Sequence, residues 1–370
     1  MIDVIIPVYR GARETRRCID SVLASEQRET LEVVVVDDAS PDPDIVAGVR
    51  DLAAQGRITL VTNETNSGFV HSVNRGMSLH PDRDVVLLNS DTEVANQWLD
   101  RLRQTACSSP DIGTATPFSN NATICSYPFP GWNGGVPGTL GLAALDRLFA
   151  TTNAGRVLDL PTAVGYCMYI RRDCLEQVGL FDAERFGRGY GEENDFCLRA
   201  ARAGWRNVLA GDVFVFHEGA VSFSSERSER AEAALQALLE VHPTYTRLVR
   251  DFSARDPVHS LREAVDAVRV AAGVEEAHRV LAEHAIHRAQ LAARLNAAEE
   301  LCEERARLVA ELQRGLAHAE GLVGESNDEI AKLRGGLAHA EAIVLKRNAE
   351  LERIRASWLG RYVEFLLKKT

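Results

Sequence analysis

The chain has 370 residues and a formal net charge of -11 at pH 7. That length exceeds a single hydrophobic core, so we expect one large α/β domain and a further segment. The acidic balance excludes a nucleic-acid-binding protein, which needs a basic face to release counterions from phosphates. We therefore expect any phosphate ligand to be held locally, by a metal ion or by backbone amides.

The cysteines and the N-terminus favour a cytoplasmic protein. The seven cysteines are scattered, form no CxxC pair and are odd in number, which is typical of reduced, mostly buried thiols. The first residues lack a basic region and enter a strand-like run directly, so no signal peptide is expected. No run of 18 apolar residues is present to span a membrane.

Over residues 1–222, short β-branched runs alternate with amphipathic helical stretches. This alternation predicts an α/β domain with a mixed, mainly parallel sheet flanked by helices. The predicted strands are Val4–Val8, Leu31–Val36, Ile58–Thr62, Val85–Leu88, Ala163–Ile170 and Val213–Phe216, and the predicted helices are Glu14–Ala24, Ile45–Ala54, Val70–Leu79, Asn96–Cys107 and Asp195–Ala203. The irregular segment Pro117–Leu140 is long enough to predict either a functional lid or a disordered loop.

After residue 222 the sequence becomes rich in Ala, Glu, Arg and Leu, which predicts a helical linker region over 223–290 and a coiled coil over 291–357. One heptad position stays apolar from Leu295 to Phe365, and its companion position is weaker. A nine-residue block beginning at Leu312 recurs at Leu333, an offset of three heptads. A solitary helix would leave this stripe in water, so we expect a homo-oligomer.

The last segment, 358–370, predicts an amphipathic basic helix with Trp358, Tyr362 and Phe365 on one face. Two interpretations stay open. The helix either makes peripheral contact with the inner face of the plasma membrane or forms the last turns of the coiled coil.

Polar residues follow several predicted strands, at the edge where α/β folds bind ligands. Pro7, Val8 and Tyr9 close the first strand, and Asp38 follows the second. Next come Asn66, Gly68 and Asn74, and then Asn89, Ser90, Asp91 and Glu93 after the buried strand Val85–Leu88. A carboxylate in that position suits Mg²⁺ or Mn²⁺ bridging two phosphates.

A second acidic group, Glu192, Glu193 and Asp195, opens a helix, and His217 ends a strand. Taken singly, these residues also fit structural roles. Acidic residues stabilise a helix N-terminus, and a strand-end histidine can simply be buried.

The ordered set of motifs resembles the family 2 inverting glycosyltransferases of the GT-A fold. The set is Pro-Val-Tyr, Val-Asp-Asp-x-Ser, Asn-x-Gly-Phe, Asn-Arg-Gly, Leu-Asn-Ser-Asp-Thr-Glu-Val, Gly-x-Phe-Asp, Glu-Glu-Asn-Asp-Phe-Cys-Leu-Arg and Val-Phe-His. Within that family the chain looks most like the rhamnosyltransferase-like branch of bacterial O-antigen and surface-polysaccharide biosynthesis. The resemblance covers residues 2–222 and does not extend into the tail.

The resemblance implies a role for each matching position. Asp38 would bind a pyrimidine base in a nucleotide pocket lined by Pro7, Val8 and Tyr9. The further nucleotide-binding residues would be Asn66, Gly68, Asn74, Asn89 and Ser90. Asp91 would bind a divalent metal on the diphosphate, with His217 and Glu93 as further ligands. Glu193 would be the catalytic base, Glu192 is the alternative base, and Asp195 flanks them. Asn89 stands where the family's Asp-x-Asp motif has its first aspartate, which weakens the expected metal site.

The expected reaction is the inverting transfer of a sugar from a nucleotide diphosphate to a hydroxyl of a growing surface glycan, with a carboxylate taking the proton. The resemblance favours dTDP-rhamnose as the donor, and UDP-hexoses and UDP-galactofuranose remain open. The acceptor is expected to be lipid-linked and to lie near Trp132. The alternatives are a catalytically weak coiled-coil scaffold of a polysaccharide-assembly complex, a nucleotidyltransferase and a dinucleotide-binding oxidoreductase.

Overall fold

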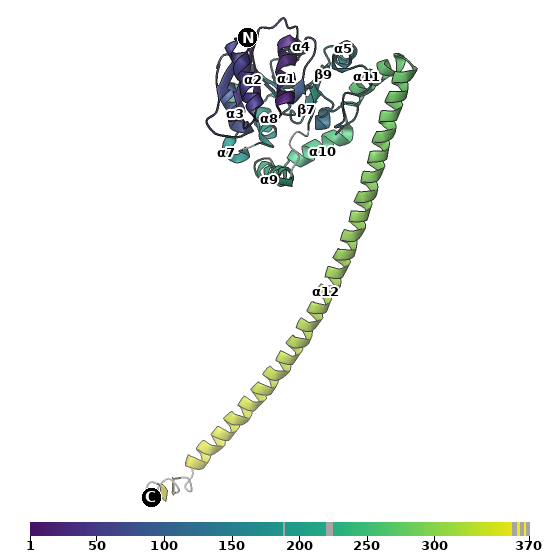
Figure 1. The fold of residues 1–370 in the computed structure, drawn as a ribbon. Coiled ribbons are helices and arrows are strands. Elements are labelled where there is room, and N and C mark those ends of the chain that lie inside the picture. The colour runs from purple at the N-terminus through teal and green to yellow at the C-terminus, as the bar shows by residue number, and fades with distance from the viewer. Residues whose placement is uncertain (188, 220–224, 357–360, 363–365, 368–370) are drawn as a thin grey trace. The chain divides into compact units, whose positions relative to one another are not determined.

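The computed structural model describes residues 1–187, 189–219, 225–356, 361–362 and 366–367, with the backbone alone for 225–230. The chain divides into two compact units, Met1–His287 and Arg288–Thr370, which we describe separately. Figure 1 shows the course of the chain through its helices and strands.

The first unit is built on an eight-stranded sheet with the order β3-β2-β1-β4-β8-β6-β9-β7. Strands β1 to β4 run parallel to one another, β8 is antiparallel to both β4 and β6, and β7 is antiparallel to β9. These strands are β1 (Ile2–Val8), β2 (Leu31–Asp37), β3 (Thr59–Thr62), β4 (Asp84–Leu88), β6 (Ile112–Phe118), β7 (Val157–Leu160), β8 (Cys167–Ile170) and β9 (Arg206–Phe214).

Helices cover both faces of this sheet because successive side chains of a strand point to opposite faces. Val4 and Ile6 of β1 belong to one apolar core and Ile5 belongs to the other. The helices of the first unit before residue 225 are α1 (Ala12–Ala24), α2 (Pro43–Ala54), α3 (Phe69–Met77), α4 (Trp98–Ala106), the 3₁₀ turn η1 (Thr123–Cys125), α5 (Leu142–Thr152), α6 (Arg172–Val178), α7 (Ala183–Phe186) and α8 (Glu192–Arg202).

The register of the parallel strands places their carboxyl ends together. Val8 is paired with Asp37, and Asp37 is paired with Thr62. The loops that follow β1, β2, β3 and β4 therefore leave the sheet at one edge. A separate two-stranded ribbon, β5 (Thr92–Glu93) with β10 (Phe216–His217), joins the segment after β4 to the segment after β9.

Three further helices and the start of α12 complete the first unit: α9 (Ser225–Val241), α10 (Tyr245–Arg255), α11 (His259–Ala271) and α12 (Val274–Ala356). Arg269 of α11 is fully buried and binds Glu276 and Glu283 of α12, with nitrogen to oxygen distances of 2.6 to 2.9 Å. Glu276 and Glu283 in turn accept hydrogen bonds from Thr139 and Gly138. The first turns of α12 thus attach to the irregular segment 117–140.

In the second unit, residues 288–356 continue α12 as an unbroken helix whose side chains are all exposed. Its heptad residues Leu295, Leu316 and Leu337 are each about 60% exposed. The predicted amphipathic helix 358–370 lies, except for residues 361–362 and 366–367, outside the described residues. Within the part of the chain that the structure describes, we find no helix with both the length and the apolar character needed to span a bilayer.

The predicted fold class is confirmed: a mixed, mainly parallel sheet flanked by helices is followed by a long helix. The pairing of that helix into a coiled coil and the domain boundaries at 222, 290 and 357 stay predictions. The sequence patterns did not predict β6, β7, α5 or α6, and they placed only the end of β9. The segment 117–140, predicted to be irregular, contains the end of β6 and the turn η1.

Candidate active site

The loop after β3 is organised by the buried carboxylate of Asp38. One oxygen of Asp38 accepts hydrogen bonds from the side chain of Asn63 and the backbone N–H of Ser67, at 2.7 and 2.8 Å. The other oxygen accepts the N–H of Gly68 at 2.8 Å. A carboxylate has about four acceptor positions, so three of them already serve the protein. Asp38 shapes the loop that carries Asn66 and Gly68, and one position remains for a ligand.

The Asn-Arg-Gly motif on α3 has a structural explanation. The amide of Asn74 donates to the carbonyl of Phe181 and accepts from its N–H, so both polar ends are used. Arg75 donates to the side chain of Asn63 and the carbonyl of Thr62. A Cβ on Gly76 would lie 2.6 Å from Ile5, so only glycine lets α3 approach β1 this closely. Asn74, predicted as a nucleotide ligand, is placed here as a clamp between α3 and the Phe181 segment.

The residues that end β1 lie at the same sheet edge as Asp38. The N–H of Asp38 donates to the carbonyl of Val8, and the hydroxyl of Ser40 donates to the carbonyl of Tyr9. Pro7 and Tyr9 are partly exposed, and the guanidinium of Arg10 lies over the Tyr9 ring. This arrangement leaves Tyr9 beside the Asp38 loop, where a planar base could stack.

Asp91 and His217 are brought together by the β5–β10 ribbon, although 126 positions of numbering separate them. Nε2 of His217 lies 3.4 Å from a carboxylate oxygen of Asp91. Burial alone would raise the pKa of Asp91, but the hydrogen bond and positive charge that His217 offers when its ring is protonated lower it overall. The backbone N–H of Glu218 also donates to the carbonyl of Asp91, which fixes the ribbon beside the two side chains.

The other ring nitrogen of His217 determines what this pair can bind. Nδ1 lies 2.7 Å from the carbonyl of Asn121 and therefore carries the proton, because a carbonyl only accepts. In the neutral imidazole, Nε2 then presents a lone pair toward the carboxylate of Asp91. Two acceptors that face each other fit a divalent cation between them, and a backbone carbonyl behind the ring is the usual support for a histidine ligand. The residues present therefore fit the expected metal.

The neighbouring candidates are placed differently. The carboxylate of Glu93 forms an ion pair with Arg17 at 3.3 Å, and Arg17 also contacts Glu218. Glu93 is therefore engaged with Arg17 of α1. Asn89 and Ser90 are partly exposed between β4 and Asp91, and the backbone N–H of Asn89 donates to the carbonyl of Tyr166.

Glu192 and Glu193 begin α8 as a pair of carboxyls with raised pKa values. Burial, followed by the charge of Glu193, raises the pKa of Glu192 well above its usual range. Burial raises the pKa of Glu193, and nearby backbone N–H groups only partly oppose this effect. Glu192 is 5% exposed, and its Oε2 has no hydrogen-bond partner among the described residues. A raised pKa makes a carboxylate a stronger proton acceptor, which suits a general base.

Two consecutive residues, Gly165 and Tyr166, lie beside the two candidate groups of the site. These groups are the carboxyl pair of Glu192 and Glu193 and the pair of Asp91 and His217, called the metal-type pair here. A Cβ on Gly165 would lie 3.5 Å from the side chain of Glu193. The ring of the next residue, Tyr166, stacks on His217 with centroids 5.2 Å apart. Gly165 therefore provides room beside Glu193, and the base candidate and His217 are each next to one of these two consecutive residues.

Asp195, predicted beside the base, is buried in a structural pairing. Its carboxylate binds Arg199 at 2.7 Å and His242 at 2.8 Å. His242 was not predicted, because nothing in its local sequence distinguishes it. Asp195 links α8 to the segment after α9. Because both of its oxygens are engaged in these contacts, Asp195 is not available as a free base.

The segment that carries Trp132 lies next to His217. The amide of Asn120 donates to the carbonyls of both Gly134 and His217, at 2.7 and 2.9 Å. Trp132 is half-buried against Phe129, and its indole N–H has no hydrogen-bond partner among the described residues. Sequence reasoning missed Asn120, although it joins the predicted acceptor segment to the metal-type pair.

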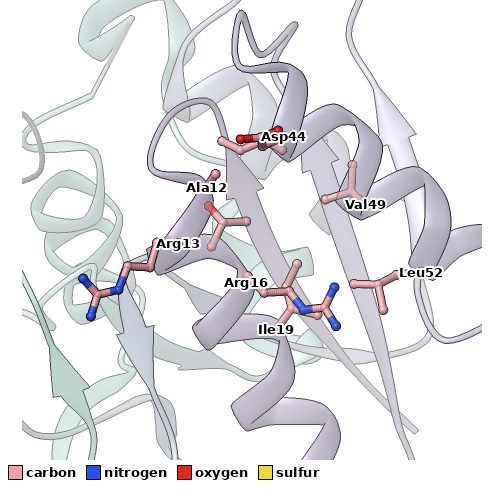
Figure 2. A pocket seen from close by; sticks show the side chains of 10 residues that line it. Ala12, Arg13, Arg16, Ile19, Asp44, Val49 and Leu52 are labelled. Carbon is pink, nitrogen blue, oxygen red and sulfur yellow. The ribbon is translucent and has the colours of Figure 1, made fainter.

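Two other features contain none of these site residues. A pocket of about 310 Å³ is lined by α1 and α2, including Arg13, Arg16 and Asp44, and contains none of the predicted site residues (Figure 2). The ligand atoms of Asp3, Glu32 and His80 lie within 4.8 Å of one another near the starts of β1 and β2. Arg83 already binds both carboxylates, at 2.9 and 2.6 Å, so a guanidinium supplies the positive charge there.

Comparison with known proteins agrees with this geometry. Residues 3–179 match the model of the family described as Glycosyl transferase family 2. These residues, which make up slightly less than half of the chain, are therefore similar to a family 2 glycosyltransferase domain. The predictions of a transferase and of a GT-A-type domain are confirmed at this level, whereas the rhamnosyltransferase-like branch stays a prediction.

Individual relatives are distant. The glycosyltransferase AglE of Haloferax volcanii is 25% identical over 225 residues, which cover 58% of this chain and 66% of AglE. The glycosyltransferase GlyG of Streptococcus pneumoniae serotype 4 is 22% identical over 104 residues, which cover 28% of this chain and 34% of GlyG. The chain thus spans between a third and two thirds of the length of these relatives.

Among solved structures, a mannosyltransferase from Pyrobaculum calidifontis, in complex with GDP-Man and Mn²⁺, superposes with a TM-score of 0.47 at 20% identity. That match covers 77% of this chain and 79% of the mannosyltransferase. A TM-score this low supports no conclusion about this protein.

Proposed function

We propose that the protein is an inverting glycosyltransferase that moves a sugar from a nucleotide diphosphate to a hydroxyl of a glycan. The observation that carries this proposal is that Glu193 lies beside Gly165, while His217, paired with Asp91, stacks on the next residue, Tyr166. In the same domain, the Asp38 loop and Tyr9 offer a place for the base.

The chemistry assigns one step to these residues. The acceptor hydroxyl attacks the anomeric carbon, the bond from that carbon to the diphosphate oxygen breaks, and Glu193 takes the hydroxyl proton. A raised pKa keeps Glu193 basic enough for this transfer. Asp91 and His217 would hold a divalent cation, Mg²⁺ or Mn²⁺, which neutralises the charge that develops on the diphosphate.

The donor and acceptor are part of the proposal. The family resemblance supports dTDP-rhamnose as the donor, with UDP-hexoses and UDP-galactofuranose as alternatives, because a pyrimidine edge suits the remaining acceptor position of Asp38. We propose a growing, lipid-linked bacterial surface glycan as the acceptor. Trp132 is half-buried in the segment that Asn120 connects to His217, and it offers an aromatic face for a sugar ring.

Nucleotide binding tests the proposal without knowledge of the acceptor. Melting temperatures are measured with UDP, dTDP, GDP and ADP, each with and without Mn²⁺, because a ligand of the folded state raises the melting point. We expect metal-dependent stabilisation by a pyrimidine diphosphate that is lost in Asp91→Ala and kept in Asp44→Ala, an exposed carboxylate on α2. If no nucleotide stabilises the wild type, the proposal fails and the scaffold alternative gains support.

We also propose that the exposed tail self-associates as a coiled coil and so holds more than one catalytic domain in one assembly. The support is the exposed apolar heptad stripe of residues 291–356. The scaffold alternative shares this feature. A wild-type chain that assembles but transfers no sugar would favour the scaffold alternative.

A further inference from the structure

The tail presents an apolar stripe to solvent along the whole of residues 291–356. The residues at the strong heptad position, called a here, include Val309, Val323 and Val344, each more than 50% exposed. Those at the companion position d include Leu312 and Leu333, each more than 60% exposed. A helix with such a stripe gains stability by burying it against another helix.

The charges beside the stripe indicate which helix fits. With Leu295 at position a, the charged g residues are Arg294, Glu329 and Glu350, and the residues five positions later, at e, are Glu299, Arg334 and Arg355. In two parallel chains in register, each g residue faces the e residue of the following heptad on the other chain. All three of these contacts join opposite charges: Arg294 with Glu299, Glu329 with Arg334, and Glu350 with Arg355.

The remaining g positions include Leu301, Leu308, Leu322 and Ile343, which are exposed and extend the apolar seam without adding like charges. Antiparallel chains would place g opposite g and e opposite e, so the three matched contacts would be lost. Charge pairing at e and g is the usual determinant of partner and orientation in coiled coils.

The internal repeat creates one competitor, a parallel pairing staggered by 21 residues. That stagger matches Arg294 with Glu320, Glu329 with Arg355 and Glu350 with Arg334, each once, whereas the in-register dimer makes each of its three contacts twice; the stagger also sets Leu312 against Leu333. However, it leaves three heptads of each chain unpaired and makes half as many charge contacts. A closed pair that buries the full stripe is therefore favoured over the stagger.

We propose that residues 291–356 pair with a second copy of this chain, parallel and in register, to give a dimer. The inference rests on the proposed self-association and is independent of the sugar-transfer chemistry. It predicts that the three matched charge contacts form and that each a or d residue packs against the same residue of the other chain.

Cys302 provides a natural reporter of this alignment because it occupies an a position and is exposed in the single chain. In register, the two Cys302 thiols face each other, and mild oxidation by copper phenanthroline joins them with loss of two electrons and two protons. The full-length chain is used in a Cys107→Ser background, since Cys107 is the other exposed cysteine among the described residues. We expect a covalent dimer on a non-reducing gel that is absent from Cys302→Ser.

A mixing experiment separates the register from the stagger. A chain with Cys302 is mixed with a longer, tagged chain that carries Cys302→Ser and Val323→Cys, both in the Cys107→Ser background. The in-register dimer gives disulfides only between like chains. A disulfide between the short and the long chain would show the 21-residue stagger and overturn the register.

Charge exchange tests the matched contacts. Glu329→Arg places like charges opposite each other twice in the dimer and should weaken it roughly tenfold. The double change Glu329→Arg with Arg334→Glu restores the attraction and should restore the dimer. Sedimentation equilibrium measures both, with an expected wild-type mass of twice the 40.6 kDa of one chain.

The outcomes separate the two proposals. A monomeric wild type would overturn both the self-association and the alignment. A stable dimer in which oxidation never joins Cys302 to Cys302 would overturn the alignment alone. Neither result bears on nucleotide binding, which is tested separately by the melting temperatures of the wild type and Asp91→Ala.

Discussion

Two buried clusters of charged residues in the first unit differ in whether their charges have partners of opposite sign. At the corner between α11 and α12, Arg269 binds Glu276, Glu283 and the hydroxyl of Tyr127, at 2.6 to 3.0 Å. At the start of α8, Glu192 and Glu193 are adjacent like charges, and one Glu192 oxygen has no partner among the described residues.

The contrast distinguishes structure from chemistry. A buried charge with complete partners holds elements in place, and removing one partner is strongly destabilising. A buried carboxyl without a partner lowers the stability of the fold when it is charged. Active sites tolerate this loss of stability because the raised proton affinity of the carboxyl serves the reaction. Asp195 makes the point within one helix, since it lies two residues from Glu193 and is fully paired with Arg199 and His242.

The largest expected effect is on the reaction. Glu193→Gln removes the proton acceptor and should lower the transfer rate by roughly 10² to 10⁴ while the melting temperature stays the same or rises. Initial rates with the donor found by the binding screen measure this. Glu184→Gln, on α7, is the matched control and should transfer at the wild-type rate. A Glu193→Gln rate within threefold of wild type would remove Glu193 from the role of base.

At the other cluster the effect should fall on stability. Arg269→Met leaves two buried carboxylates without a cation and should lower the free energy of unfolding by about 3–5 kcal/mol. Urea denaturation followed by tryptophan fluorescence measures it. The triple variant Arg269→Met, Glu276→Gln, Glu283→Gln removes the uncompensated charge and should recover most of the loss. If the triple variant is as unstable as the single one, packing rather than charge holds this corner.

A smaller effect is expected at the metal-type pair. His217→Gln removes a neutral nitrogen ligand and should raise the Mn²⁺ concentration needed for nucleotide stabilisation by at least roughly tenfold. Titration of Mn²⁺ in the thermal-shift assay gives this value. His259→Gln, an exposed residue on α11, serves as control. An unchanged Mn²⁺ requirement would show that His217 supports the ribbon without binding metal.

The smallest effect is a gain in stability. The pKa of Glu192 is raised above its unfolded value of about 4.3, so its favourable contribution is present below that pH and is lost as pH rises through the folded pKa. Glu192→Gln should match wild type near pH 4 and exceed it by ~1 kcal/mol or more at pH 8. Melting curves across this range test the sign. A variant less stable than wild type at pH 8 would mean that Glu192 is paired there.

Much of the architecture follows from local pattern. The first four parallel strands and their helices have clear periodicities, and the switch to heptads predicts the long helix. Strand β6 was missed because its run, Ile112–Phe118, contains Gly113, Thr114 and Pro117 and has no apolar alternation. It is nevertheless central, between β8 and β9, and its burial comes from partners more than 50 residues away.

The sequence by itself determined that acidic and amide groups would follow the strands at one edge, because consecutive parallel strands end together. It also determined the heptad stripe and the charges beside it. Tertiary structure decided which groups keep free acceptor positions. Asn74 and Asp195 use theirs on Phe181, Arg199 and His242, whereas Asp91 meets His217 only because β5 pairs with β10. Apart from that of Asp195 with Arg199 on the same helix, these contacts join residues far apart in the chain, and hydrogen-bond satisfaction across such separations is a property of the assembled fold.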